Sequence, residues 1–199
     1  NGKVYWSNWS GLSDVSQFIQ VQRGLGASAL GISSVGGTMN MVTKSTEAQK
    51  GGSAYFGIGN DGFRKYSVSF STGLMDNGWA ITFMGSLNTG DGYVKGTNYE
   101  GWTYFGNISK VINDHHKLSL TAFGAPQWHN QRSTMHYIED YKNSPDGGRF
   151  NNGYGYINGE AVGSGYGYNY YHKPQVSLNH YWTIDEKSTL TTSLYGSMA

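Results

Sequence analysis

The stretch KYSVSFSTGL, residues 65–74, alternates between two kinds of side chain. Its even-numbered positions are mostly large and apolar, whereas its odd-numbered positions from Ser67 onward are serine or glycine. Successive residues of a strand point to opposite faces, so this period of two predicts a strand with one apolar and one small polar face. The pattern recurs in WAITFMGSLN at 79–88 and VSLNHYWTI at 176–184, and less regularly in LSLTAFG at 118–124 and LTTSLYG at 190–196.

The connections between these stretches differ in length. Tight turns are predicted at 76–78, 113–115 and 185–187, because each carries Asn, Asp or Gly between two strand-like stretches. Longer connections are expected at about 89–101 and 130–173, and a first short link at 60–62. Tight turns at one end of a meander and long loops at the other are typical of an outer-membrane β-barrel.

Two tryptophans favour the same interpretation. Trp79 follows one tight turn and Trp182 precedes another, so both lie on the apolar face at the same end of the strands. Aromatic residues gather at that level in membrane proteins. A soluble β-sandwich remains the alternative, because its strands also alternate and its core also holds tryptophan.

The composition limits what the protein can do. Its 199 residues include 30 glycines, 16 tyrosines, 3 prolines and no cysteine, which suits many turns and aromatic strands and excludes disulfides and thiolate metal sites. The net charge of +1 gives no reason to expect a nucleic-acid partner. No spacing supports a catalytic triad or a carboxylate pair, and we expect neither catalysis nor a cofactor. Because the sequence opens without methionine and stops within a strand-like stretch, we expect a piece of a longer protein.

The glycine-rich stretch VQRGLGASALGISSVGGTMNMVTK, residues 21–44, poses a separate question. Gly26 and Gly31 have the spacing of a phosphate-binding loop, but Ile32 stands where the required lysine would follow. A dinucleotide-binding GxGxxG pattern also fails, because its third glycine is replaced by Ala29. Nucleotide binding is therefore not expected.

This stretch resembles the C-terminal part of the plug domain of TonB-dependent outer-membrane receptors. That family has a strand ending in Arg-Gly, a small-residue segment, a Gly-Gly pair, an asparagine and a Val-Thr-Lys ending. The matching residues here are Arg23, Gly24, Gly36, Gly37, Asn40, Val42, Thr43 and Lys44. Residues 89–132 look like the early barrel of such receptors from the Bacteroidetes group.

The resemblance implies an all-β protein, a transmembrane antiparallel β-barrel of about 22 strands with an N-terminal plug domain. Residues 1–50 would be the C-terminal part of the plug, and residues 51–199 the first seven or so barrel strands. Arg23 would form an ion pair with carboxylates of the barrel wall. Ser67, Ser69 and Ser71 would face the plug.

The function implied by the resemblance is active import across the cell outer membrane. A TonB-type energy-coupling protein would be the partner, outer-membrane lipid the surroundings, and a small molecule such as a metal chelate the ligand. GGTMNMVTK, residues 36–44, looks more like the siderophore, haem and cobalamin branch than the glycan branch. Gln20 departs from the glutamate that the family often carries at its position. The alternatives are a glycan or peptide importer with a surface lipoprotein, and a soluble glycan-binding β-sandwich.

Ligand-binding candidates lie in or beside the tyrosine-rich stretch 130–173, since aromatic loop residues offer stacking and hydrogen bonding. They are Trp128, His129, His136, Tyr137, Tyr168, Tyr170 and Tyr171. The alternative is that this stretch only packs on neighbouring loops. His129, His136 and His172 match no compact metal signature, so we expect polar loop histidines and no metal site. His115 and His116 are expected in a tight turn, exposed to solvent.

Overall fold

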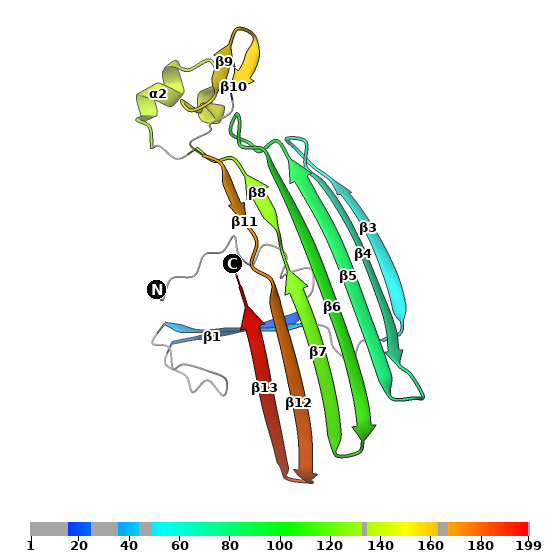
Figure 1. Ribbon diagram of the computed structural model, residues 1–199. Helices are drawn as coiled ribbons and strands as arrows, with labels where there is room; N and C mark the ends of the chain where they lie inside the picture. The colour runs from blue at the N-terminus through cyan, green and yellow to red at the C-terminus, as the bar shows by residue number, and fades with distance from the viewer. Residues whose placement is uncertain (1–15, 25–35, 44–48, 133–134, 163–166, 199) are drawn as a thin grey trace.

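The computed structural model describes residues 16–24, 36–43, 49–132, 135–162 and 167–198. Most of these residues belong to one tall, curved antiparallel sheet (Figure 1). Its long strands are β3 Gly51–Ile58, β4 Arg64–Leu74, β5 Trp79–Gly90, β6 Tyr99–Asn113, β7 His116–Gly124, β12 Gln175–Asp185 and β13 Ser188–Ser197. Within the described ranges, no helix has the length and apolarity needed to cross a membrane.

The strands follow the order β13-β12-β7-β6-β5-β4-β3, so each long strand pairs with the next long strand along the chain, and only between β7 and β12 do short strands intervene in the sequence. The short turns after β4, β6 and β12 lie at one end of the sheet, and the longer connections at the other (Figure 1). The predicted alternation of short and long connections is therefore confirmed.

One predicted loop is shorter than expected. Residues 89–90 and 99–101 are paired strand residues, which leaves only 91–98 as the loop. The Tyr99 ring covers Gly90 on the adjacent strand, where a Cβ would lie 2.6 Å from the tyrosine hydroxyl. This pairing of an aromatic ring with a glycine extends the ladder into residues whose composition suggested a turn.

The sheet exposes its apolar face and buries its polar face, which is the reverse of the arrangement in a soluble protein. Large apolar side chains of one face are 38–54% exposed: Tyr66, Val68, Phe70, Ile81, Phe83, Ile108, Leu120, Val176 and Leu178. Small polar side chains of the other face are 1–7% exposed: Ser71, Thr82, Ser86, Thr103, Asn107, Ser109 and Ser119. A β-sandwich buries its apolar faces against each other. The opposite arrangement is that of a lipid-facing barrel wall.

Hydrogen bonds satisfy the buried polar face. Asn107 Nδ2 donates to Ser119 Oγ and to Thr121 Oγ1, both at 2.8 Å, and Ser109 Oγ donates to Asn107 Oδ1 at 2.7 Å. The same face holds a small apolar cluster, made of Met84, Phe105, Phe123 and Ala125. Because buried polar groups need such partners, these cross-strand bonds fix the register of β6 against β7.

Aromatic side chains mark both ends of the apolar face. At the end with the long connections, the pairing aligns Phe56, Tyr66, Leu87 and Trp102 in one row. At the other end lie Trp79, whose ring has Lys110 Nζ at 5.1 Å from its centroid, and Trp182. The predicted placement of these two tryptophans, exposed and beside tight turns, is confirmed.

Two N-terminal strands form a separate antiparallel sheet, β1 Ser16–Arg23 with β2 Gly37–Thr43. Gly37 pairs with Arg23 and has a φ of +123°, and a Cβ there would lie 2.3 Å from the Gln22 carbonyl oxygen, so the position requires glycine. Gly24 also has a positive φ, Gly36 lies in open space, and Asn40 pairs with Gln20. Among the described residues, no carboxylate forms an ion pair with Arg23. The assignment of residues 1–50 to a plug stays a prediction.

Candidate ligand-binding surface

Two three-residue strands bring most of the predicted ligand-binding residues together. Strand β8, Gln127–His129, pairs with β6 on one side and with β11, Asn169–Tyr171, on the other. The register places Trp128 opposite Tyr170, and His129 opposite Asn169. Trp128, His129, Tyr168, Tyr170 and Tyr171 therefore gather in this ribbon, although 38 residues of chain, 130–167, separate its parts.

Alternation divides the ribbon between two faces. Trp128 and Tyr170 are cross-strand neighbours on one face, whereas His129 and Tyr171 project to the other. Tyr168, just before β11, stacks on Trp128 with ring centroids 6.2 Å apart and an angle of 24°. Because Tyr168 and Tyr170 are more than half exposed, the Trp128 side offers an aromatic platform to a ligand.

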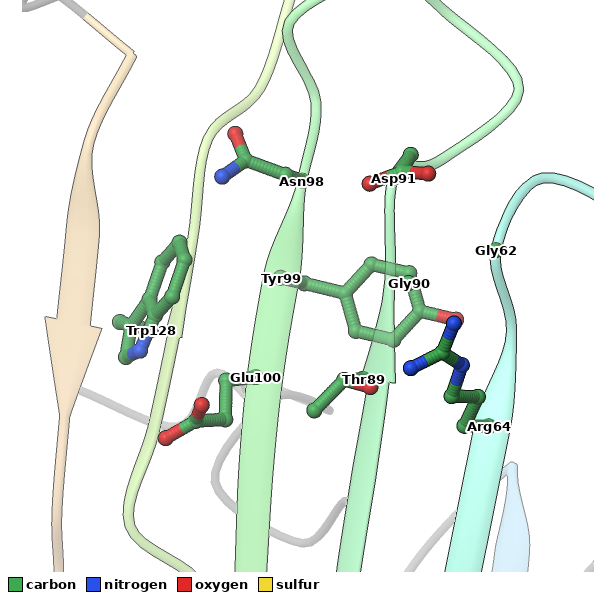
Figure 2. A pocket seen from close by; sticks show the side chains of 9 residues that line it. All are labelled: Gly62, Arg64, Thr89, Gly90, Asp91, Asn98, Tyr99, Glu100 and Trp128. Atoms are coloured by element: carbon green, nitrogen blue, oxygen red, sulfur yellow. The ribbon is translucent and has the colours of Figure 1, made fainter.

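A groove with a volume of about 300 Å³ begins at Trp128 (Figure 2). It crosses β6 and β5 to Arg64, the first residue of β4. Its lining is Gly62, Arg64, Thr89, Gly90, Asp91, Asn98, Tyr99, Glu100 and Trp128.

The groove combines one cation, two carboxylates and two aromatic rings. Glu100 is already engaged, since its Oε1 accepts a hydrogen bond of 2.8 Å from Trp102 Nε1. Arg64 makes no ion pair with any described carboxylate. Such a groove can hold a small polar ligand between a guanidinium at one end and an indole at the other. Sequence reasoning missed Arg64 and Glu100, because only the register of four strands places them beside Trp128.

The other two candidates, His136 and Tyr137, lie in a small structured unit that we call the cap, residues 135–162. It contains α2 Ile138–Asn143, a 3-10 turn Gly147–Arg149, and the hairpin of β9 Gly155–Ile157 with β10 Glu160–Val162. The stretch expected as one long connection is thus partly folded (Figure 1).

The cap encloses His136 and exposes Tyr137. The His136 side chain is only 8% exposed, and its ring centroid lies 5.8 Å from that of Tyr141 and 5.1 Å from that of Phe150. Its Nδ1 lies 3.9 Å from Asp140 Oδ2, and its Nε2 has no hydrogen-bond partner. Tyr137 precedes α2, with its side chain 83% exposed. Neither residue belongs to the β8–β11 ribbon.

Charged side chains anchor the cap to the neighbouring loops. Arg149 binds Asp61 at 2.7 Å, with its guanidinium carbon 4.8 Å from the centroid of the Tyr93 ring. Lys95 binds Asp146 at 2.5 Å, and its backbone N–H donates to the Arg149 carbonyl at 3.0 Å. The turn at 59–63 and the loop 91–98 therefore hold the cap over the end of the sheet.

Two tyrosines continue the cap towards the 91–98 loop. Tyr154 packs on Gly96, which has a φ of +70° and would place a Cβ 2.3 Å from the Tyr154 ring. The hydroxyls of Tyr154 and Tyr156 are 3.4 Å apart, and this hydrogen bond raises the pKa of Tyr154. Tyr154 therefore stays neutral at physiological pH and can act as a hydrogen-bond donor.

The anchor predicts a measurable effect of charge reversal. Arg149→Asp would set a second carboxylate against Asp61, which we expect to loosen the cap by about 1 kcal/mol, or roughly fivefold in its open population. Limited proteolysis within 135–162 measures this. The double variant Arg149→Asp/Asp61→Arg should restore protection. Lys142→Asp, on α2 and without a described ion pair, is the matched control and should leave cleavage unchanged.

The three loop histidines are not brought together. His129 lies in β8, His136 inside the cap, and His172 Nε2 lies 3.0 Å from the Tyr104 hydroxyl. In the described part of the chain, no group of three or more His, Cys, Asp or Glu side chains is placed to hold a metal ion.

Comparisons with known proteins bear on the fold. No family model matches the sequence, and no curated protein matches it either. The structure is similar to the ferripyoverdine receptor of the outer membrane of Pseudomonas aeruginosa, solved with ferripyoverdine bound, at a TM-score of 0.71 and 13% sequence identity. The likeness covers 92% of this chain and 24% of that receptor, so the chain spans about a quarter of its length. The likeness therefore shows that this chain shares the fold of the matching part of that receptor.

Proposed function

We propose that the protein is an outer-membrane receptor that imports a scarce extracellular ligand with energy supplied through a TonB-type coupling protein. The observation that carries the proposal is the inverted sheet, with its apolar face exposed and its small polar face buried. Lipid offers no hydrogen bonds to a free strand edge, so such a wall works only as part of a closed barrel. The fold likeness to a ferripyoverdine receptor supports the same function.

In this proposal residues 1–50 belong to a plug and residues 51–199 to the first strands of the barrel that surrounds it. Arg23 would pair with carboxylates of the wall and release them when the coupling protein remodels the plug. The ligand would be a ferric siderophore, haem or cobalamin, bound on the extracellular side. The end with the cap and the long connections is the extracellular end, because outer-membrane barrels have short turns on the periplasmic side.

The aromatic platform and the groove are the proposed points of first ligand contact, because Arg64, Glu100 and Trp128 share the outward face with Tyr66 and Trp102 and lie beyond them, towards the long connections. Trp128 and Tyr168 would stack on flat parts of the ligand, and Arg64 would attract its anionic groups. The cap lies beside them and would limit the escape of a bound ligand. A glycan or peptide importer with a surface lipoprotein is the second candidate, because exposed stacked rings also suit the apolar faces of sugars.

The soluble β-sandwich is not supported. Nine of the described strands form one large sheet, and the large apolar side chains of its outer face stay exposed in the part of the chain that the structure describes.

Uptake measurements test the proposal. Cells that lack this protein should lose import of a radiolabelled ferric siderophore, haem or cobalamin, and cells that lack the coupling protein should bind the ligand without importing it. If all three ligands enter normally and growth on a glycan or peptide fails instead, the second candidate replaces the first. Recovery of the protein in a soluble fraction without detergent would overturn both.

A further inference from the structure

Two histidines from different strands meet near the end of the sheet with the short turns. His116 Nδ1 and His180 Nε2 are 3.1 Å apart, and the two rings are inclined by only 16° with centroids 5.2 Å apart. His116 pairs across the ladder with Trp182, and His180 pairs with Leu118. The histidines are therefore diagonal neighbours on the face that also carries Leu118 and Trp182.

The turn that precedes His116 explains this position and corrects an expectation. His116 is not in the turn but begins β7. Asn113 Oδ1 accepts hydrogen bonds from the backbone N–H groups of His115 at 3.0 Å and His116 at 2.9 Å. These bonds stabilise a tight turn, so the next strand begins at His116. His115 remains in the turn, where its Nδ1 lies 2.8 Å from the Thr183 carbonyl oxygen. His115 is thus engaged elsewhere, whereas His116 faces His180.

The distance between the two ring nitrogens is suited to a metal ion. Zinc binds imidazole nitrogen at about 2.0–2.1 Å, so a tetrahedral ion holds two such nitrogens roughly 3.4 Å apart. The observed 3.1 Å is within a few tenths of this, and a small rotation of both rings would turn their lone pairs towards a shared ion. We propose that His116 and His180 form a two-histidine site for a divalent transition-metal ion such as Zn²⁺, Ni²⁺ or Cu²⁺.

The surroundings define what kind of site this is. Among the described residues no third His, Cys, Asp or Glu joins the pair, so water would complete the coordination. His116 begins its strand at the turn, which gives the ion access from water. The Trp182 ring, with its centroid 5.7 Å from that of His116, shields one side of the pair. A site of two imidazoles and water suits borderline divalent ions. Its affinity should be higher for Cu²⁺ than for Ni²⁺ or Zn²⁺.

The site would join the two strands that are most difficult to bring together. β7 and β12 pair directly, yet the chain between them runs from Ala125 to Pro174. Closing a loop of that length costs entropy that local turns avoid. An ion bound to both histidines would stabilise this pair of strands by an amount that rises with the logarithm of the ion concentration once that concentration exceeds the Kd. The inference is independent of the imported ligand, because both histidines lie at the opposite end from the cap (Figure 1).

Metal titration of the whole protein, purified in detergent without a histidine tag, tests the proposal. Cu²⁺ should give an electron paramagnetic resonance spectrum with coupling to two imidazole nitrogens. Zn²⁺, added in calorimetry, should bind with one-to-one stoichiometry at this site. Losing one of two linked ligands should weaken binding by roughly 10²-fold, so His180→Ala and His116→Gln should each abolish the two-nitrogen signal.

His115→Ala is the matched control, because it removes the adjacent histidine and should leave Cu²⁺ coupling and Zn²⁺ affinity unchanged. Two results would overturn the proposal. The first is a wild-type Cu²⁺ spectrum without two-imidazole coupling, which can be read even if a variant fails to fold. The second is Zn²⁺ binding that is equal in wild type, His180→Ala and His116→Gln.

Discussion

Leu178→Arg is expected to destabilise the protein by roughly 2–4 kcal/mol when it is embedded in a bilayer. Leu178 lies on the apolar face of β12, level with Leu120 and Leu194 on the strands to either side. It is 42% exposed in the chain, so water would tolerate arginine there but hydrocarbon would not. The free energy of unfolding in lipid vesicles, from urea titration, measures the effect.

The neighbouring residue supplies the matched control. Asn179 lies on the polar face of the same strand, and its side chain makes no described hydrogen bond or ion pair, so Asn179→Arg adds the same charge to the opposite side. Asn179 is half-buried on this inward face, where a barrel wall is polar and accepts charge, so we expect a smaller loss than for Leu178→Arg. Equal effects of the two variants would contradict the assignment of faces.

The depth of a residue in the bilayer gives a second comparison, between arginine at Leu178 and arginine at Ile184. Ile184 shares the face of Leu178 but lies beside the short turn, where the cost of arginine in a bilayer falls to about 0–1 kcal/mol. A gradient from Leu178 to Ile184 is specific to lipid, because a water-exposed face would tolerate both variants equally. A tolerated Leu178→Arg would therefore remove the main support for the membrane-wall interpretation.

Alternation made the long strands predictable. In 65–74 and 176–184 every second residue is small or polar, and that period alone identifies strands and separates their faces. Alternation could not show which face is buried, because a β-sandwich and a β-barrel have the same pattern. The exposure of Phe83 and the burial of Thr82, its neighbour, settled that question.

The ribbon and the groove could not be predicted in the same way. QWH and NYY, the sequences of β8 and β11, are too short to show a period. They are strands only because β6 offers a partner to β8, and β8 offers one to β11. The approach of His116 to His180 depends on the register of β7 against β12. Their order in the sequence does not reveal such a register, since more than fifty residues lie between them. The tyrosine content marked the right region, but not which rings would stack.

Gly96→Ala is expected to release the cap, with a loss of roughly 2–4 kcal/mol from the docking of residues 135–162 onto the 91–98 loop. Gly96 has a φ of +70°, which costs an L-residue about 1–2 kcal/mol. A Cβ there would also lie 2.3 Å from Tyr154 Cδ2 and 3.0 Å from its Cβ, so the tyrosine must move as a whole. Such overpacking adds typically about 1–3 kcal/mol.

Hydrogen exchange of the cap measures this release. A loss of about 3 kcal/mol corresponds to an increase on the order of 10²-fold in the open population, so amides within 138–162 should exchange correspondingly faster. The amides of β6 should keep their protection. If the cap retains ligand, the dissociation rate should rise as well, while ligand association changes little.

Two further variants separate the cost of backbone strain from the cost of the steric clash with Tyr154. Gly147 also has a positive φ, +53°, but a Cβ there would meet nothing within 4 Å. Gly147→Ala should therefore cost only about 1–2 kcal/mol, from backbone strain alone. Tyr154→Ala would make room at Gly96, so the double variant Gly96→Ala/Tyr154→Ala should lose less than the sum of the two single changes. Strict additivity would mean that Tyr154 does not rest on Gly96, and the docking of the cap would then depend on its polar contacts, such as the ion pairs with Asp61 and Lys95.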